Sequence, residues 1–140
     1  MRGRDALGRP VPADDPGAVP AVPEQALPDA EALTLAQSLL DDGRAFGAHE
    51  VLEASWKATP RDDPARRRIW QGLAQVCVGI THLQRGNRVG AARLLRRGAG
   101  NLAGHPVAEQ ASAAATAVEQ GAEPAPIRLR GCAPPPPGQG

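Results

Sequence analysis

Residues 69–84, IWQGLAQVCVGITHLQ, contain no Asp, Glu, Lys or Arg. An uncharged helix of this length is typical of one that is buried on nearly all sides. At about 100° per residue, the aliphatic residues share one side of the helix. The other side carries three polar residues, namely Gln71, Gln75 and His82. The stretch is too short to cross a membrane, so it predicts the central helix of a helical bundle.

Start and stop signals flank this helix and define a hairpin. Asp63 is a suitable N-cap and Pro64 suits the first helical position, while Gly86 stops the helix. Asn87 can cap the next helix, over residues 88–103. The connection is so short that an antiparallel helical hairpin is expected over about 64–103.

Working outward, three further segments have helical periodicity and caps, at residues 28–42, 44–58 and 106–120. The predicted fold class is therefore all-α, a compact multihelical bundle of about five helices spanning residues 28–120. Residues 1–27 are Pro-, Ala- and Asp-rich without periodicity, which predicts disorder. Residues 121–140 are expected to form a Pro-rich tail. Residues 127–130 alternate in hydropathy, but four residues are too few to predict a strand.

The location of the protein follows from what its ends and cysteines favour. The first five residues lead into prolines and aspartates rather than an apolar stretch, so no signal peptide is expected. Cys77 lies in the apolar helix and Cys132 in the Pro-rich tail, which argues against a disulfide framework. A cytoplasmic protein without membrane association is predicted.

The segment 44–58 carries the residues that suggest a site. Five of them cluster on one helical face at spacings of three and four: Phe46, His49, Glu50, Glu53 and Trp56. We expect this face to turn inward, where it would supply partners for the polar stripe of the central helix. Gly72 and Gly79 beside that stripe favour close approach of another backbone. The alternative is that Ala48, Val51, Leu52 and Ser55 face the core.

Three ordered blocks resemble a known family. They are Phe46-x-x-His49-Glu50-x-x-Glu53-x-x-Trp56, then Gln71-Gly72-Leu73-x-Gln75 with His82, and Gly86-Asn87-x-x-Gly90-Ala91-x-x-Leu94-Leu95. Over about residues 30–103 the chain resembles the domain of unknown function 309. The resemblance implies a small prokaryotic helical domain, in which the His-Glu and Trp positions belong to the defining pattern. It implies no established activity.

Two interpretations of the polar centre stay open. In the leading one, the chain is a structural or interaction module with a protein as its partner, and its His, Glu and Gln side chains form a buried hydrogen-bond network or line a pocket. In the alternative, His49, Glu53 and His82 hold a divalent transition metal as a two-His-one-carboxylate site. Glu50 would then be the general base of a metal-dependent hydrolase or oxygenase.

A third interpretation rests on charge. Residues 61–97 carry nine Arg against Asp62 and Asp63. A clustered basic surface can bind RNA or another polyanion. The candidate face comprises Arg66, Arg67, Arg85, Arg88, Arg93, Arg96 and Arg97. Almost no exposed aromatic residue accompanies them for base stacking, so the support is charge clustering alone.

Overall fold

In the computed structural model, residues 2–129 and 134 are described, and five helices account for most of them. The elements in chain order are β1 (Arg2–Arg4), β2 (Pro10–Pro12), α1 (Asp29–Asp41), α2 (Ala45–Ala58), α3 (Pro64–Gln84), α4 (Arg88–Asn101) and α5 (Pro106–Glu119). The predicted all-α bundle is confirmed. Cys132 and the prolines at 135–137 lie outside the described residues.

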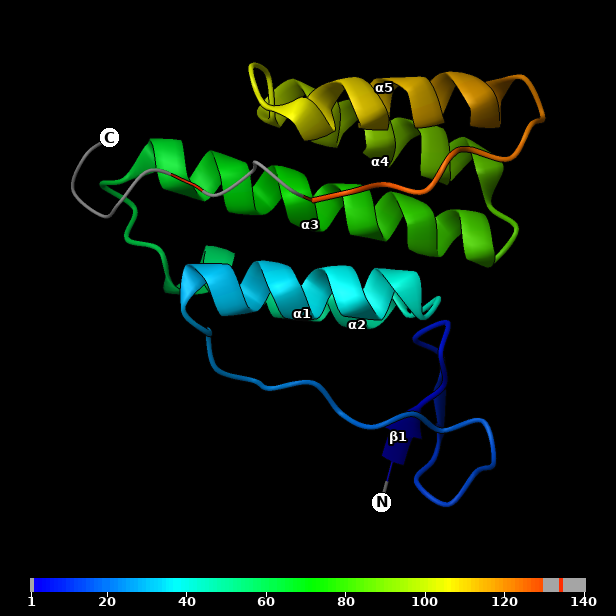
Figure 1. The fold of residues 1–140 in the computed structure, drawn as a ribbon. Coiled ribbons are helices and arrows are strands. Elements are labelled where there is room, and N and C mark those ends of the chain that lie inside the picture. Colours follow the sequence, from blue (N-terminus) through cyan, green and yellow to red (C-terminus); the bar gives the residue numbers. More distant parts are fainter. Residues whose placement is uncertain (1, 130–133, 135–140) are drawn as a thin grey trace.

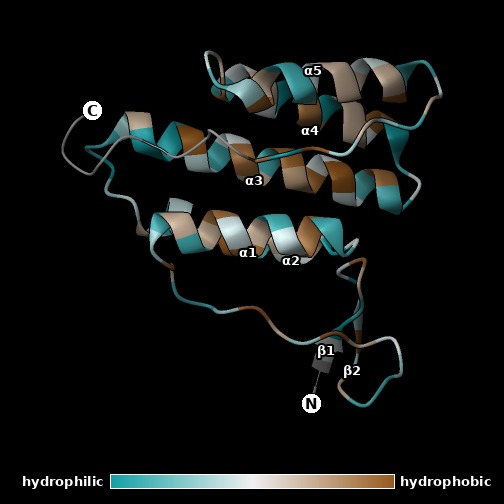
Figure 2. Cartoon of the chain, viewed as in Figure 1, coloured by the Kyte–Doolittle hydropathy of each residue, from teal (hydrophilic) through white to brown (hydrophobic). Residues whose placement is uncertain are grey.

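The helices pack in chain order, each against the next, with α3 in the middle (Figure 1). On one side α3 contacts α2, which in turn packs on α1, and on the other side α3 contacts α4, which packs on α5. Figure 2 shows apolar residues along the middle of α3 and hydrophilic ones at its ends. The largest fully buried side chain, Trp70, comes from α3, as do Leu73 and Val76. Within the described part of the chain, no helix is long and apolar enough to cross a membrane.

The helix boundaries follow the local signals. The Asp63 carboxylate accepts a hydrogen bond from the backbone N–H of Arg66 at 3.4 Å, and Pro64 begins α3. Asn87 caps α4, with its Oδ1 2.9 Å from the backbone N of Gly90. Gly86 has φ +84°, which favours glycine at the stop between the two helices. The predicted α3–α4 hairpin is therefore confirmed.

Glycines bring α3 and α4 into close contact. A Cβ on Gly72 would lie 2.8 Å from Leu102 Cγ, and one on Gly79 would lie 2.9 Å from Leu95 Cγ. From the other side, a Cβ on Gly98 would lie 2.8 Å from the carbonyl oxygen of Gly72. The predicted close backbone approach is thus correct, but the approaching helix is α4 rather than α2.

The N-terminal segment differs from the prediction of disorder over residues 1–27. Strands β1 and β2 pair antiparallel, with Gly3 opposite Val11. The Asp5 carboxylate accepts hydrogen bonds from the backbone N–H groups of Leu7 and Arg9, which closes the connecting loop. This side-chain-to-backbone turn chemistry is local and does not depend on hydrophobic periodicity.

The C-terminal segment also departs from the predicted boundary at residue 120. The segment after α5 runs back across α3 in extended form (Figure 1). Ile127 and Leu129 are 6% and 2% exposed and belong to the hydrophobic core, and Pro134 is also buried. The packed domain therefore continues to residue 129, and the expected tail contributes two aliphatic side chains to the core.

Candidate interaction surface on helix α2

Helix α2 has two faces, and the sequence did not determine which of them is buried against the other helices. The fully buried one comprises Ala45, Gly47, Ala48, Val51, Leu52 and Ser55. The five residues expected to turn inward are all half-buried instead: Phe46, His49, Glu50, Glu53 and Trp56. The inward prediction for this second face is therefore wrong. Small side chains fit the close α1 and α3 contacts, and the aromatic and charged ones occupy the flank.

A short charged chain runs along this flank within α2. His49 Nε2 lies 2.7 Å from Glu53 Oε2, and Lys57 Nζ lies 2.7 Å from Glu53 Oε1. The hydrogen bond from Lys57, together with the His49 ring, holds the pKa of Glu53 below its ordinary value, against the opposite effect of burial. The His49 ring is 17% exposed at its side chain, and its Nδ1 is buried without a hydrogen-bond partner among the described residues.

Phe46 is the meeting point of the N-terminal segment and the bundle. The guanidinium carbons of Arg4 and Arg85 lie 4.9 and 5.8 Å from the centre of its ring. The ring of His49 is tilted against it at a centroid distance of 5.3 Å. Gly8, with φ +80°, sits directly on the ring, because a Cβ there would be 2.3 Å from Phe46 Cγ. Only glycine allows the loop this approach.

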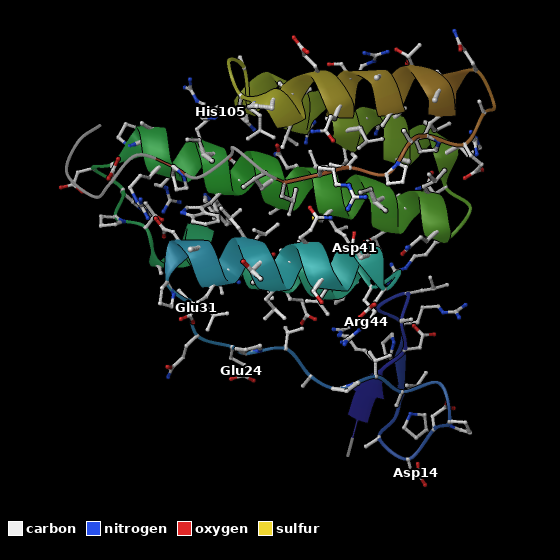
Figure 3. The ribbon with its side chains drawn as sticks, viewed as in Figure 1. Asp14, Glu24, Glu31, Asp41, Arg44 and His105 are labelled. Carbon is white, nitrogen blue, oxygen red and sulfur yellow. The ribbon has the colours of Figure 1, made fainter. Side chains whose placement is uncertain are left out.

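Backbone contacts hold the same segment in place. Arg85 Nε donates to the carbonyl of Leu7 at 2.8 Å, and Arg44 Nη2 donates to the carbonyl of Pro20 at 2.6 Å. Figure 3 shows Arg44 between the helices and the N-terminal segment. A cavity of about 400 Å³ lies between the segment and α2, and both Glu50 and Phe46 line it.

At the other end of α2, an arginine side chain also stacks on an aromatic ring, that of Trp56. The guanidinium carbon of Arg67 lies 5.2 Å from the Trp56 ring centre, within cation–π range. Arg67 Nη1 also donates to the carbonyl of Thr59 at 2.8 Å. The α2 flank therefore presents an aromatic ring at each end, each stacked with arginine, and the His49–Glu53 pair between them.

The polar stripe of α3 does not meet α2 in the predicted network. Gln75 Oε1 accepts from Asn101 Nδ2 of α4 at 2.7 Å. His82 Nδ1 accepts from Asn87 Nδ2 at 3.3 Å, and Gln71 is half-buried. The stripe is divided, because its hydrogen bonds go to α4 and to the cap between α3 and α4. Of the predicted network, the hydrogen bonds of the described residues include only the one between His49 and Glu53.

The predicted metal ligands are likewise not brought together. His49 pairs with Glu53, whereas His82 bonds to Asn87, the N-cap of α4. Across residues 2–129 and 134, no group of three or more His, Cys, Asp and Glu side chains is arranged to hold a metal ion. The shared three-ligand site is therefore not formed, and among the residues that the structure describes Glu50 has no metal site at which to act as the predicted general base.

Most arginines of the predicted polyanion face have partners within the chain. Arg66 makes a two-pronged contact with Asp29, and Arg88 donates to the carbonyls of Val118 and Ala122. Arg96 bonds to Glu119 and Thr116, and Arg67 and Arg85 stack on Trp56 and Phe46. Arg93 and Arg97 have no such partner in the described part of the chain. No observation on the described residues tests binding of a polyanion, so the prediction for this face stays a prediction.

Comparison with known proteins identifies the helical region. Residues 33–94 match the family described as "Domain of unknown function (DUF309)". Over these residues the chain is similar to that family. The "Uncharacterized protein YpuF" of Bacillus subtilis (strain 168) is 42% identical over 50 residues, which is 36% of this chain and 28% of that protein. The aligned part is thus well under a third of that protein's length. No solved structure matches the chain significantly.

The domain of unknown function 309 match covers most of α1, all of α2 and α3, and the first half of α4. Both segments that dock on the helices, residues 2–22 and 122–129, lie outside it. Sequence reasoning missed Gly8 and Arg4 as neighbours of Phe46. The one available signal was Asp5 followed by Gly8, a turn composition that the surrounding prolines obscured.

Proposed function

We propose that this chain is an interaction module whose α2 surface, formed by Phe46, His49 and Glu50, binds a polypeptide turn with glycine at its tip. The observation that carries the proposal is the loop of residues 5–9, which lies on the Phe46 ring through Gly8. That loop comes from outside the matched family region. The surface therefore accommodates a segment that is not part of the helical domain.

The chemistry of the α2 surface supports binding of a polypeptide rather than catalysis. Phe46 offers an aromatic face to basic side chains, as with Arg4. Arg44 and Arg85 donate hydrogen bonds to backbone carbonyls of the docked segment, at Pro20 and Leu7. Backbone carbonyls are present in any partner, so these two contacts need no particular sequence. Glycine at the tip supplies the specificity, because a side chain would collide with the ring.

A displaced N-terminal segment tests this proposal. Gly8→Val places a side chain against Phe46 and should release the loop, whereas Gly3→Ala, whose added Cβ meets only ordinary contacts, should not. We expect a labelled peptide of residues 1–22 to bind the Gly8→Val protein in trans and to bind the Gly3→Ala protein at least about 10-fold more weakly, because the tethered segment competes.

The receptor side provides the control. Adding Phe46→Ala to Gly8→Val should abolish peptide binding, while adding Val89→Ala, at an exposed site on α4, should leave it intact. Fluorescence anisotropy measures the binding, and circular dichroism checks that helix content is retained. Failure of the peptide to bind the Gly8→Val protein, or equal binding after Phe46→Ala, would contradict the proposal.

A further inference from the structure

We infer that α1, α3 and α5 form a second binding site, a groove for an extended polypeptide segment of aliphatic–basic–aliphatic sequence. Residues 127–129, Ile-Arg-Leu, are the chain's own occupant of this groove. The groove shares no residue with the α2 surface, so the inference does not depend on the function proposed above. We refer to it as the C-terminal groove.

Two glutamines recognise the backbone of the occupant from opposite sides. Gln37 of α1 donates to the carbonyl of Ile127 at 3.2 Å and accepts from the N–H of Leu129 at 2.7 Å. Gln110 of α5 donates to the carbonyl of Arg128 at 3.0 Å and accepts from its N–H at 2.7 Å. In an extended chain, successive backbone groups point to opposite edges. Each glutamine amide thus takes the place of one neighbouring strand.

Alternation of the side chains completes the recognition. Ile127 and Leu129 point inward, where both are buried in the core, and Arg128 between them is exposed. Arg128 Nη1 lies 3.7 Å from Asp41 Oδ1 at the C-terminal end of α1, and Figure 3 marks the position of Asp41. The aliphatic side chains set the register, and Asp41 favours a basic residue at the middle position.

The groove is larger than its occupant. Residues 123–128 border a partly open cavity of about 570 Å³, and the helices line it with Leu40, Ile80, Leu83, Leu95 and Ala114. Ile127 is one of the residues that line this cavity. A longer aliphatic side chain at the position of Ile127 in a segment from another protein would bury more surface there. The most suitable partner is therefore an extended segment with a large aliphatic residue, a basic residue and Leu in that order.

The tether makes the chain's own segment a competitor for such a partner. Gly121, at φ +78°, turns the chain after α5, and Ala122, Glu123, Ala125 and Pro126 are exposed. A short tether gives an effective concentration on the order of 1 mM. If the isolated segment binds with a Kd on the order of 10 µM, the tethered copy weakens binding of a competing segment about 100-fold.

A released occupant tests the C-terminal groove in the full chain. The double variant Ile127→Asp and Leu129→Asp removes the two anchors, while the sequence of every helix stays the same. A fluorescent peptide of residues 122–130 should bind this variant about 100-fold more tightly than it binds the unmodified protein. Adding Gln37→Leu, or using a peptide with both aliphatic residues replaced by Asp, should remove the binding. Equal binding to both proteins, or none to a helical double variant, overturns the inference.

A second experiment keeps every contact residue and applies even if the double variant unfolds. A specific protease site inserted after Gly121 allows the full chain to be cut once in the exposed linker. In equilibrium dialysis at protein concentrations well above a Kd on the order of 10 µM, we expect the cut segment to remain bound to the helices and to be released on addition of excess 122–130 peptide. A segment that does not bind at those concentrations, or one that the peptide cannot displace, overturns the inference.

Discussion

The contact between α3 and α4 gives a quantitative prediction through two glycines of α4. A Cβ added at Gly98 would lie 2.8 Å from the carbonyl oxygen of Gly72 and 2.8 Å from a Val76 methyl carbon. The backbone oxygen cannot move without shifting α3. Gly100, two residues further along the same helix, has no atom within 4 Å of its added Cβ. The same substitution to Ala therefore meets a packed interface at one position and open space at the other.

The magnitude follows because both substitutions occur in the same helix. Replacing Gly by Ala in a helix favours the folded state by up to about 1 kcal/mol, somewhat less near a helix end. Overpacking a filled interface costs typically about 1–3 kcal/mol. The helix-propensity gain is shared by Gly98→Ala and Gly100→Ala, so the difference between them isolates the steric cost. We expect Gly98→Ala to be less stable than Gly100→Ala by about 1–3 kcal/mol.

Urea denaturation followed by circular dichroism measures this difference, provided that the slope of the transition is the same for both variants. Gly100→Ala should have a free energy of unfolding equal to or above that of the unmodified protein. If the two variants agree within about 0.5 kcal/mol, the helices are not in contact through Gly98 and the close approach of α3 and α4 is refuted.

Three further predictions concern charged and titratable side chains. Because folding lowers the pKa of Glu53, the ionised carboxylate stabilises the protein above the ordinary pKa of 4.5, and this stabilisation is lost as pH falls through the folded pKa. Glu53→Gln should lower the free energy of unfolding at pH 7 by less than about 1 kcal/mol, since the Glu53 side chain is one third exposed. In a pH series of urea titrations, this difference between the variant and the unmodified protein should vanish near pH 2. Burial raises the pKa of the Cys77 thiol to about 12, so its alkylation at pH 8 should be at least about 100-fold slower in the folded protein than in urea. Mass spectrometry measures both rates, and comparable rates would place Cys77 at the surface. Arg66→Lys should lower the free energy of unfolding, measured by urea denaturation, by about 1–2 kcal/mol, because the two-pronged contact with Asp29 is lost. Arg68→Lys, at an exposed position, should leave it unchanged. An equal effect of the two substitutions would refute the role of the contact with Asp29.

The helices were predictable because their ends carry short-range signals. Asp63 followed by Pro64 begins α3, and Gly86 followed by Asn87 separates α3 from α4. These side chains bond to backbone groups three residues away, so the information lies within a single turn. The caps and the order of helices therefore follow from the sequence alone.

The orientation of α2 was not predictable in the same way. Its two faces both have helical spacing, and the chain's only Phe lies on the one that is half-buried. Aromatic content favoured the wrong face because Phe46 is covered by Gly8, a residue far away in the sequence and outside the helical domain. Local periodicity identifies an apolar face but does not tell whether a helix or a docked loop covers it.

The docking of the C-terminal segment could not be predicted from the sequence for a related physical reason. Leu129 and Gln37 bond across 92 positions in the chain, and no strand among residues 2–129 pairs with the extended segment. Side-chain amides of two helices satisfy its backbone, so neither periodicity nor strand length marks it. The alternation of residues 127–130 was the one sign of an extended segment, and its partners lie on α1 and α5.

The limits of the family match bear on how this domain is stabilised. Leu95, Leu102, Val107 and Ala115 are fully buried and all lie beyond residue 94. Below about 70–80 residues, a single core rarely supplies more than about 3–5 kcal/mol, so residues 33–94 alone are too few to bury α3 on both sides. In this chain α5 and the C-terminal segment cover the side of α3 and α4 that would otherwise be exposed. The C-terminal segment is thus part of the folded core through Ile127 and Leu129, and the N-terminal segment is bound to the surface of α2 through Gly8. We therefore expect, under both binding proposals, that a competing segment replaces a docked one while the helices stay folded.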